Sequence, residues 1–231
     1  METHRLAADR SKGPVTGLFE RPANAFALYV LAHGAGADMR HRFMESMAAE
    51  LARAGVASLR FNFPYTEAGR RAPDPAAVCE AYVRSVCADA RKLAPDLPLF
   101  AGGKSMGGRM TSQAWAKQPL EDVRGLIFLG FPLHAAKQPA TERAAHLREV
   151  FVPMLFLQGT RDALAERALM REVVGGIGPH AVLHEVEGGD HSFEVPKSSG
   201  RTAEQVRAAL ADTIAEWLAR LARLGPKSKS S

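Results

Sequence analysis

The chain has 231 residues, of which 46% are hydrophobic and 24% charged, as expected for one globular domain with a sizeable core. Its formal net charge is +5, but the Lys and Arg residues are scattered along the chain, so we expect no nucleic-acid partner. No apolar run approaches the roughly 20 residues of a membrane helix, and the first ten residues lack the hydrophobic segment of a signal peptide, so we expect a cytoplasmic protein without membrane contact.

Short apolar runs alternate with amphipathic stretches along most of the chain. Strands are predicted near residues 15–19, 26–32, 56–61, 98–103, 125–130, 154–159 and 181–186, the first of them at a sheet edge. Helices are predicted near residues 40–54, 76–94 and 108–116, with a short one at 142–150 and a last one that runs from a capping box at Thr202 to Gly225-Pro226. This alternation predicts an α/β fold with a mainly parallel, twisted sheet and helices on both faces.

One domain accounts for most of the chain. Residues 15–225 are expected to form it, preceded by a flexible N-terminus (1–14) and followed by a disordered tail (226–231). The segment 132–150 lacks strand character and lies where a lid would be, but it is short. We therefore expect an open or lightly covered site with a minimal lid.

Both cysteines, Cys79 and Cys87, fall in the predicted helix 76–94. A separation of eight residues along a helix puts their Cα atoms about 12 Å apart, which is too far for a disulfide. We expect two buried thiols that pack as small hydrophobic side chains.

The segment around Ser105 carries the most informative motif. Residues 103–107, GKSMG, have the form G-x-S-x-G between a predicted strand and a predicted helix, which is the pattern of a nucleophile elbow. Glycines two residues before and after the serine permit a turn tight enough to hold its hydroxyl clear of the sheet. The pattern is common by chance, so its interpretation depends on an acid and a histidine elsewhere in the chain.

Such an acid and histidine follow Ser105 in the chain order serine, acid, histidine, which is the order that accompanies a nucleophile elbow. Asp162 comes just after the predicted strand 154–159, and His191 follows the strand 181–186, so all three candidates lie at the carboxyl ends of strands. Two other interpretations stay open at this point. Asp162 could instead cap a helix that begins near residue 163, and Asp190 is a rival acid, although it adjoins His191 and is better placed to order that loop.

A small-residue loop after the predicted strand 26–32 completes the candidate site. Its sequence, HGAGA at residues 33–37, leaves backbone N–H groups free to point at an oxyanion. The expected donors are Ala35, or alternatively Gly36, together with Met106, the residue after the nucleophile. His33 is expected to be structural, whereas His134 is near the site without an assigned role.

Other chemistries are not supported by the motifs. The chain has neither H-E-x-x-H nor paired C-x-x-C, so we expect no metal site. Residues 103–105 read GKS, but the earlier glycine of the phosphate-binding loop pattern is missing, and no G-x-G-x-x-G opens a dinucleotide fold. We therefore expect no cofactor.

Six stretches together resemble one family: LAHGAG at 31–36, RFNFPY at 60–65, GGKSMGGR at 102–109, GFPLH at 130–134, LQGTRD at 157–162 and GDHSF at 189–193. They are similar to the α/β-hydrolase group that includes bacterial hydrolase-like proteins, the testis-expressed proteins and a subunit of a histone-acetyltransferase regulatory complex. This group resembles dienelactone hydrolases, whose nucleophile is cysteine where this chain has Ser105. The resemblance implies the α/β-hydrolase fold and a hydrolase-type site, with no particular substrate.

The sequence therefore predicts a serine hydrolase that cleaves an ester or related small acyl compound through Ser105, Asp162 and His191. The alternative is a non-catalytic binding or scaffold protein on the same frame. The sequence leaves the substrate and the oligomeric state open.

Overall fold

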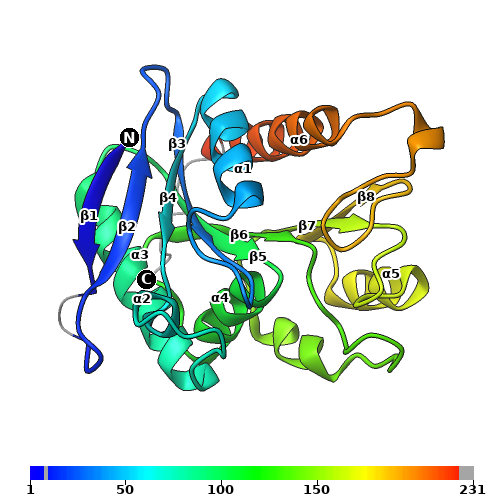
Figure 1. The fold of residues 1–231 in the computed structure, drawn as a ribbon, viewed down its shortest axis with the longest axis horizontal. Coiled ribbons are helices and arrows are strands. Elements are labelled where there is room, and N and C mark those ends of the chain that lie inside the picture. The colour runs from blue at the N-terminus through cyan, green and yellow to red at the C-terminus, as the bar shows by residue number, and fades with distance from the viewer. Residues whose placement is uncertain (8–9, 224–231) are drawn as a thin grey trace.

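A mostly parallel sheet runs through the middle of the computed structural model, which describes residues 1–7 and 10–223 (Figure 1). Within the described residues the sheet has eight strands in the order β1-β2-β4-β3-β5-β6-β7-β8. The strands are β1 (Glu2–Leu6), β2 (Val15–Glu20), β3 (Ala27–Ala32), β4 (Val56–Phe61), β5 (Leu99–Lys104), β6 (Val123–Leu129), β7 (Met154–Gly159) and β8 (Ala181–Val186). Only the pairings β1–β2 and β2–β4 are antiparallel and the other five are parallel, which confirms the predicted α/β fold with a mainly parallel sheet.

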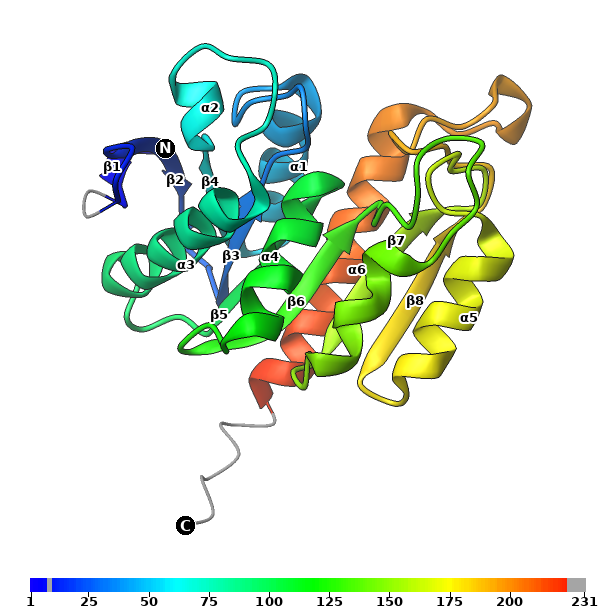
Figure 2. The same ribbon diagram turned by 90° about the horizontal axis from the view of Figure 1, so that it is seen from below.

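Helices cover both faces of the sheet (Figures 1 and 2). They are α1 (Arg42–Arg53), α2 (Pro64–Glu67), α3 (Ala76–Leu93), α4 (Met106–Lys117), α5 (Arg167–Ile177) and α6 (Ala203–Arg223), with 3-10 helices η1 (Glu142–Glu149) and η2 (Lys197–Ser199). Helices α1 and α6 pack on one face, while α3, α4 and α5 pack on the other. The predicted capping box is present at the start of α6, where the Thr202 amide donates to Gln205 Oε1 and the Gln205 amide donates to Thr202 Oγ1.

The core follows from strands that are apolar on both sides. Every residue of β3, β4 and β7 is buried, which is typical of strands covered by helices on both faces. The two cysteines contribute to one of these layers as free, buried thiols, as predicted. Burial raises the pKa of Cys79 to about 11 and that of Cys87 to about 12, so both stay protonated near neutral pH.

The N-terminus differs from the expectation of a flexible segment over residues 1–14. Residues 2–6 form β1, which pairs antiparallel with β2, so β1 and not β2 is the edge strand. Polar contacts hold this strand in place, since Arg5 donates to both Thr16 and Glu67. Polar and apolar residues do not alternate in this segment. It forms a strand because the edge of β2 pairs with its backbone and because the Glu67 carboxylate binds Arg5.

Two other expectations concern the C-terminus. The predicted helix end at Gly225-Pro226 and the disordered tail at 226–231 lie outside the described residues, and α6 is described as far as Arg223.

The turn between β5 and α4 lies in close contact with the backbone at the end of β3. A Cβ atom on Gly107 would lie 2.5 Å from the carbonyl oxygen of Ala32 and 2.6 Å from that of His33. A Cβ on Gly103, whose φ is +154°, would lie 2.3 Å from the same Ala32 oxygen. Only glycine fits at these two positions, which is the steric requirement expected from the G-x-S-x-G pattern.

We expect Gly107→Ala to lower the free energy of unfolding by about 3 kcal/mol or more, because the added methyl group overlaps backbone atoms that cannot rotate away. Gly175→Ala, in helix α5, is the matched control. No heavy atom lies within 4 Å of its added Cβ, so this change should raise stability by about 0.5–1 kcal/mol. Urea unfolding measures both effects, and equal midpoints for Gly107→Ala and wild type would contradict the close approach.

Candidate active site

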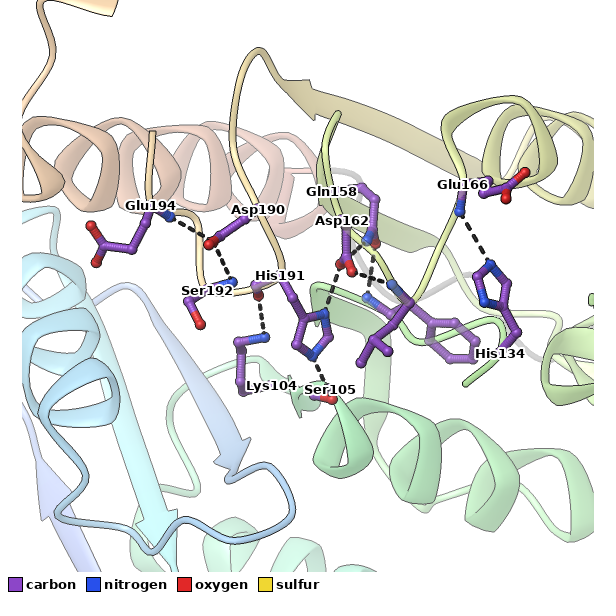
Figure 3. Close-up of polar contacts among 12 residues, drawn as sticks. Lys104, Ser105, His134, Gln158, Asp162, Glu166, Asp190, His191, Ser192 and Glu194 are labelled. Carbon is purple, nitrogen blue, oxygen red and sulfur yellow. Dashed lines mark hydrogen bonds and ion pairs between the residues drawn. The ribbon is translucent and has the colours of Figure 1, made fainter. Parts of the chain in front are cut away.

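Three side chains from distant parts of the chain meet at the carboxyl edge of the sheet (Figure 3). Ser105 follows β5, Asp162 follows β7, and His191 lies in the loop after β8. The hydroxyl of Ser105 is 2.9 Å from Nε2 of His191, and Nδ1 of the same ring is 2.7 Å from Oδ2 of Asp162. The structure thus brings together the three residues that the sequence singled out.

The backbone around Ser105 exposes its hydroxyl to the imidazole. Ser105 has φ +51° and ψ −116°, an unusual conformation for a residue with a side chain. The Ser105 amide donates to the Leu129 carbonyl at 3.0 Å, which fixes the turn against β6. Its side chain does not cap α4, so the hydroxyl is available to donate to His191.

The Asp162 carboxylate is buried and accepts three hydrogen bonds. Oδ2 accepts from His191 and, at 2.5 Å, from Nε2 of Gln158, while Oδ1 accepts from the Leu164 amide at 2.8 Å. Helix α5 begins only at Arg167, so Asp162 does not cap it. Because an ionised carboxylate only accepts hydrogen bonds, the ring is assigned as carrying its proton on Nδ1 and presenting a free Nε2 lone pair to Ser105.

Sequence reasoning did not assign Gln158 a role at this site. Its Oε1 accepts from the Phe131 amide at 2.9 Å while its Nε2 holds Asp162, so it fixes the acid against the neighbouring strand end. The signal was a polar residue within an otherwise apolar buried strand, since such a side chain needs internal partners.

Asp190 orders the loop that carries His191. Its Oδ1 accepts from the amides of Ser192 at 2.8 Å and Glu194 at 2.9 Å. Figure 3 shows this carboxylate turned away from the imidazole, toward its own loop. Asp162, and not the rival Asp190, is therefore the carboxylate that contacts His191.

Lys104 is a second residue that the sequence analysis left without a role. Its Nζ donates to the backbone carbonyl of His191 at 2.6 Å and lies 5.8 and 5.7 Å from the ring centres of Phe43 and Phe193. Burial lowers the pKa of Lys104 to about 8, against the opposing effect of Asp162 and Asp190. The residue before the nucleophile thus holds the histidine loop in place.

The loop after β3 faces the same site. The backbone N–H groups of Ala35, Gly36 and Met106 donate no hydrogen bond to any other residue that the structure describes. His33 anchors this loop, because its Nδ1 donates to the Gly34 carbonyl at 2.8 Å and its Nε2 accepts from the Phe63 amide at 3.2 Å. His33 is therefore structural, as expected, and the loop amides are left free.

His134 and the segment 132–150 lie apart from this site. His134 is buried, its Nδ1 donates to the Ala135 carbonyl, and its Nε2 accepts from the Glu166 amide at 3.4 Å. Its role in the structure is to hold the segment after β6 against the segment before α5. The short helix predicted near 142–150 is present as η1 and packs beside α4 (Figure 2).

A cavity of about 700 Å³ opens beside Ser105 and His191. Its wall comes from the loop after β3, the start of α1, the histidine loop and the start of α6. Among the described residues, none from 132–150 lines it.

The described residues provide neither a metal-binding cluster nor a membrane-spanning helix. Nowhere in the described part of the chain do three His, Cys, Asp or Glu side chains group closely enough to hold a metal ion. No helix within residues 1–7 and 10–223 combines the length and apolar character that crossing a membrane requires.

Comparison with known proteins places this architecture in a family. A family model described as an alpha/beta hydrolase domain matches residues 25–219, and the chain therefore belongs to the α/β-hydrolase domain family. A dienelactone hydrolase from Anabaena variabilis has the same fold, with 18% identity and a TM-score of 0.74 over 95% of this chain and 97% of that one.

Two serine hydrolase structures are similar in the same way. One is an α/β serine hydrolase homologue from Coxiella burnetii, with 19% identity and a TM-score of 0.71 over 95% of this chain and 96% of that one. The other, from Xanthomonas campestris, is described as an α/β serine hydrolase without a lid, and it matches with 19% identity and a TM-score of 0.71 over 94% of each chain. These likenesses show a shared fold.

The anchoring role of His33 predicts a pH effect on stability. Burial lowers its pKa from an ordinary 6.5 to about 4, so the unfolded chain binds more protons than the folded chain between these values. The free energy of unfolding should therefore fall as the pH drops from 6.5 to 4, by up to about 3 kcal/mol from this residue.

His33→Gln keeps a polar side chain at this position and removes the titration. Urea unfolding between pH 4 and 7 should show a flatter dependence for this variant than for wild type. The pKa of His146 is also lowered by burial to about 4, but its contribution is common to both proteins. If the free energy of unfolding depends on pH equally in wild type and His33→Gln, then His33 does not cause the loss of stability at low pH.

Proposed function

We propose that this protein is a serine hydrolase that cleaves a carboxylic ester or related small acyl compound through an acyl-enzyme. The observation that carries the proposal is the continuous hydrogen-bonded chain from the Ser105 hydroxyl through His191 to Asp162. A serine hydroxyl is a weak nucleophile at neutral pH, and it needs an adjacent base whose tautomer and orientation are fixed by a third group. The two contacts of His191, one with Ser105 and one with Asp162, support that arrangement.

Acylation would begin with transfer of the Ser105 proton to Nε2 of His191 as Oγ attacks the substrate carbonyl carbon. Asp162 would stabilise the imidazolium through the bond to Nδ1. The oxyanion of the tetrahedral intermediate would accept hydrogen bonds from the amides of Met106 and of Ala35 or Gly36. Each such donor is typically worth about 10²–10³ in rate. Collapse of the intermediate would break the bond to the leaving group, which takes its proton from His191.

Deacylation would reverse these roles with water as the nucleophile. His191 would accept a proton from water, the resulting oxygen would attack the ester carbonyl on Ser105, and His191 would return the proton to Oγ as the acid product leaves. No step in this cycle requires a metal or cofactor.

Similar proteins also support the proposed hydrolase function. Proteins of similar fold are described as serine hydrolases and esterases, which agrees with the proposed chemistry. We also propose that the chain belongs with the testis-expressed and acetyltransferase-complex-subunit group, on the six stretches that resemble it. A scaffold role is the alternative, but a scaffold has no need for a complete serine, histidine and aspartate arrangement.

Labelling with a fluorophosphonate probe tests the nucleophile. Wild type should react covalently at Ser105 because the probe needs an activated serine, whereas Ser105→Ala should not be labelled. Ser112→Ala is a control that removes a buried serine hydroxyl elsewhere. Equal labelling of wild type and Ser105→Ala, with the adduct found at another residue, would remove Ser105 from the mechanism.

Hydrolysis of short p-nitrophenyl esters tests the base. His191→Ala should lose at least about 10³-fold in kcat, since the serine then lacks a proton acceptor. His134→Ala, which alters a buried histidine outside the cavity, should keep far more activity once its folding has been verified by circular dichroism. A wild-type rate no higher than that of buffer on any acyl substrate would favour the scaffold.

A further inference from the structure

The wall of the cavity beside Ser105 contains a mostly buried arginine for which residues 1–7 and 10–223 supply no partner. Arg207, in the second turn of α6, is only 8% exposed and lines the cavity together with Ser105 and His191. It makes no ion pair and no hydrogen bond with any residue that the structure describes. By contrast, the buried carboxylates Asp74 and Asp162 are both hydrogen-bonded.

The stem of Arg207 is packed against the protein, but none of its nitrogen atoms is both enclosed and unpartnered, so its guanidinium is open to the cavity. Removing a charge from water carries a penalty of several kcal/mol unless an opposite charge and hydrogen bonds compensate it. A ligand that covers Arg207 must therefore supply the opposite charge itself, because no described residue forms an ion pair with this guanidinium. A guanidinium binds carboxylates with two parallel hydrogen bonds, which suits an anionic organic ligand.

Other charges on the cavity wall reinforce this preference. Arg42, at the start of α1, lines the cavity and also makes no ion pair within the described residues, and Lys104 adds a third positive group near Ser105. Glu194 is the one acidic residue on the described wall, and its carboxylate extends away from Ser105 in Figure 3. A cavity lined mainly by one sign of charge attracts ligands of the opposite sign.

We propose that the acyl substrate carries a carboxylate, which pairs with Arg207 while the scissile carbonyl lies at Ser105. This inference rests on the proposed serine hydrolase function and specifies its substrate class. Arg207 is then a specificity-determining residue, and Arg42 strengthens the same subsite from the start of α1.

Matched ester pairs that differ by one charge test the proposal. On the acyl side the pair is monophenyl adipate and phenyl methyl adipate, and on the leaving-group side it is 4-acetoxybenzoate and its methyl ester. Wild type should prefer the anionic member of at least one pair in kcat/KM, and the pair that shows the preference identifies which half of the substrate bears the charge. Arg207→Met should reduce that preference by about 10- to 100-fold, mainly through the anionic ester.

Three further variants separate charge from structure. Arg207→Lys keeps the charge and should recover part of the preference, and Arg42→Met changes an exposed side chain that poses little risk to folding and should weaken the preference several-fold. Arg220→Met removes an exposed arginine from the same helix and should leave the preference unchanged. An anionic preference that is absent, or that is equal in wild type, Arg207→Met and Arg42→Met, would overturn the proposal.

Binding without turnover distinguishes this inference from the proposed function. Calorimetric titration of adipate into Ser105→Ala should show binding that the added Arg207→Met substitution weakens at least tenfold. If wild type hydrolyses no ester but this difference is seen, the subsite stands and the hydrolase proposal fails. If neutral esters are hydrolysed but adipate binding is absent or insensitive to Arg207, the hydrolase proposal stands and the anionic subsite fails.

Discussion

The contact between the backbone at the end of β3 and the turn at Ser105 determines where the rest of the site can form. Gly103 and Gly107 let this turn approach the Ala32 carbonyl to distances that no side chain would allow. This approach brings the loop after β3 next to Ser105, since a Cβ on Gly34 would lie 3.5 Å from the Ser105 Cβ, and Ser105 itself has a positive φ. The strain at Ser105 is held by packing, because β3 and β6 are hydrogen-bonded or packed against the turn on both sides.

The fold was largely predictable because its strands are buried on both faces. Strand β7 begins and ends where its apolar run does, and every residue of β3, β4 and β7 is buried because these strands lie between two layers of helices. The edge strand β1 was not predictable in this way. Its residues are mostly polar, and its pairing depends on the free edge of β2 and on the distant Glu67, which local periodicity does not encode.

The candidate site likewise has residues that the sequence predicted and residues that it did not. Ser105, Asp162 and His191 could be proposed from the chain because a motif and strand ends mark them, and the close approach of their side chains follows from sheet order. Gln158, Lys104 and Arg207 could not be given roles from the sequence. Gln158 and Lys104 act through contacts with residues far away in the chain, and the place of Arg207 on the cavity wall depends on how α6 packs, which residue type alone does not reveal.

Lys104 adds a mechanical consequence to its position next to Ser105 in the chain. Its ammonium group donates a hydrogen bond to the backbone carbonyl of His191, and its own backbone is joined to Ser105 by a peptide bond. Ser105 and His191 are therefore linked through Lys104, by one peptide bond and one hydrogen bond, in addition to their direct hydrogen bond. When the edge of the sheet moves, Ser105 and the imidazole of His191 should therefore move together. The distance between them should vary less than the position of either side chain relative to the rest of the protein.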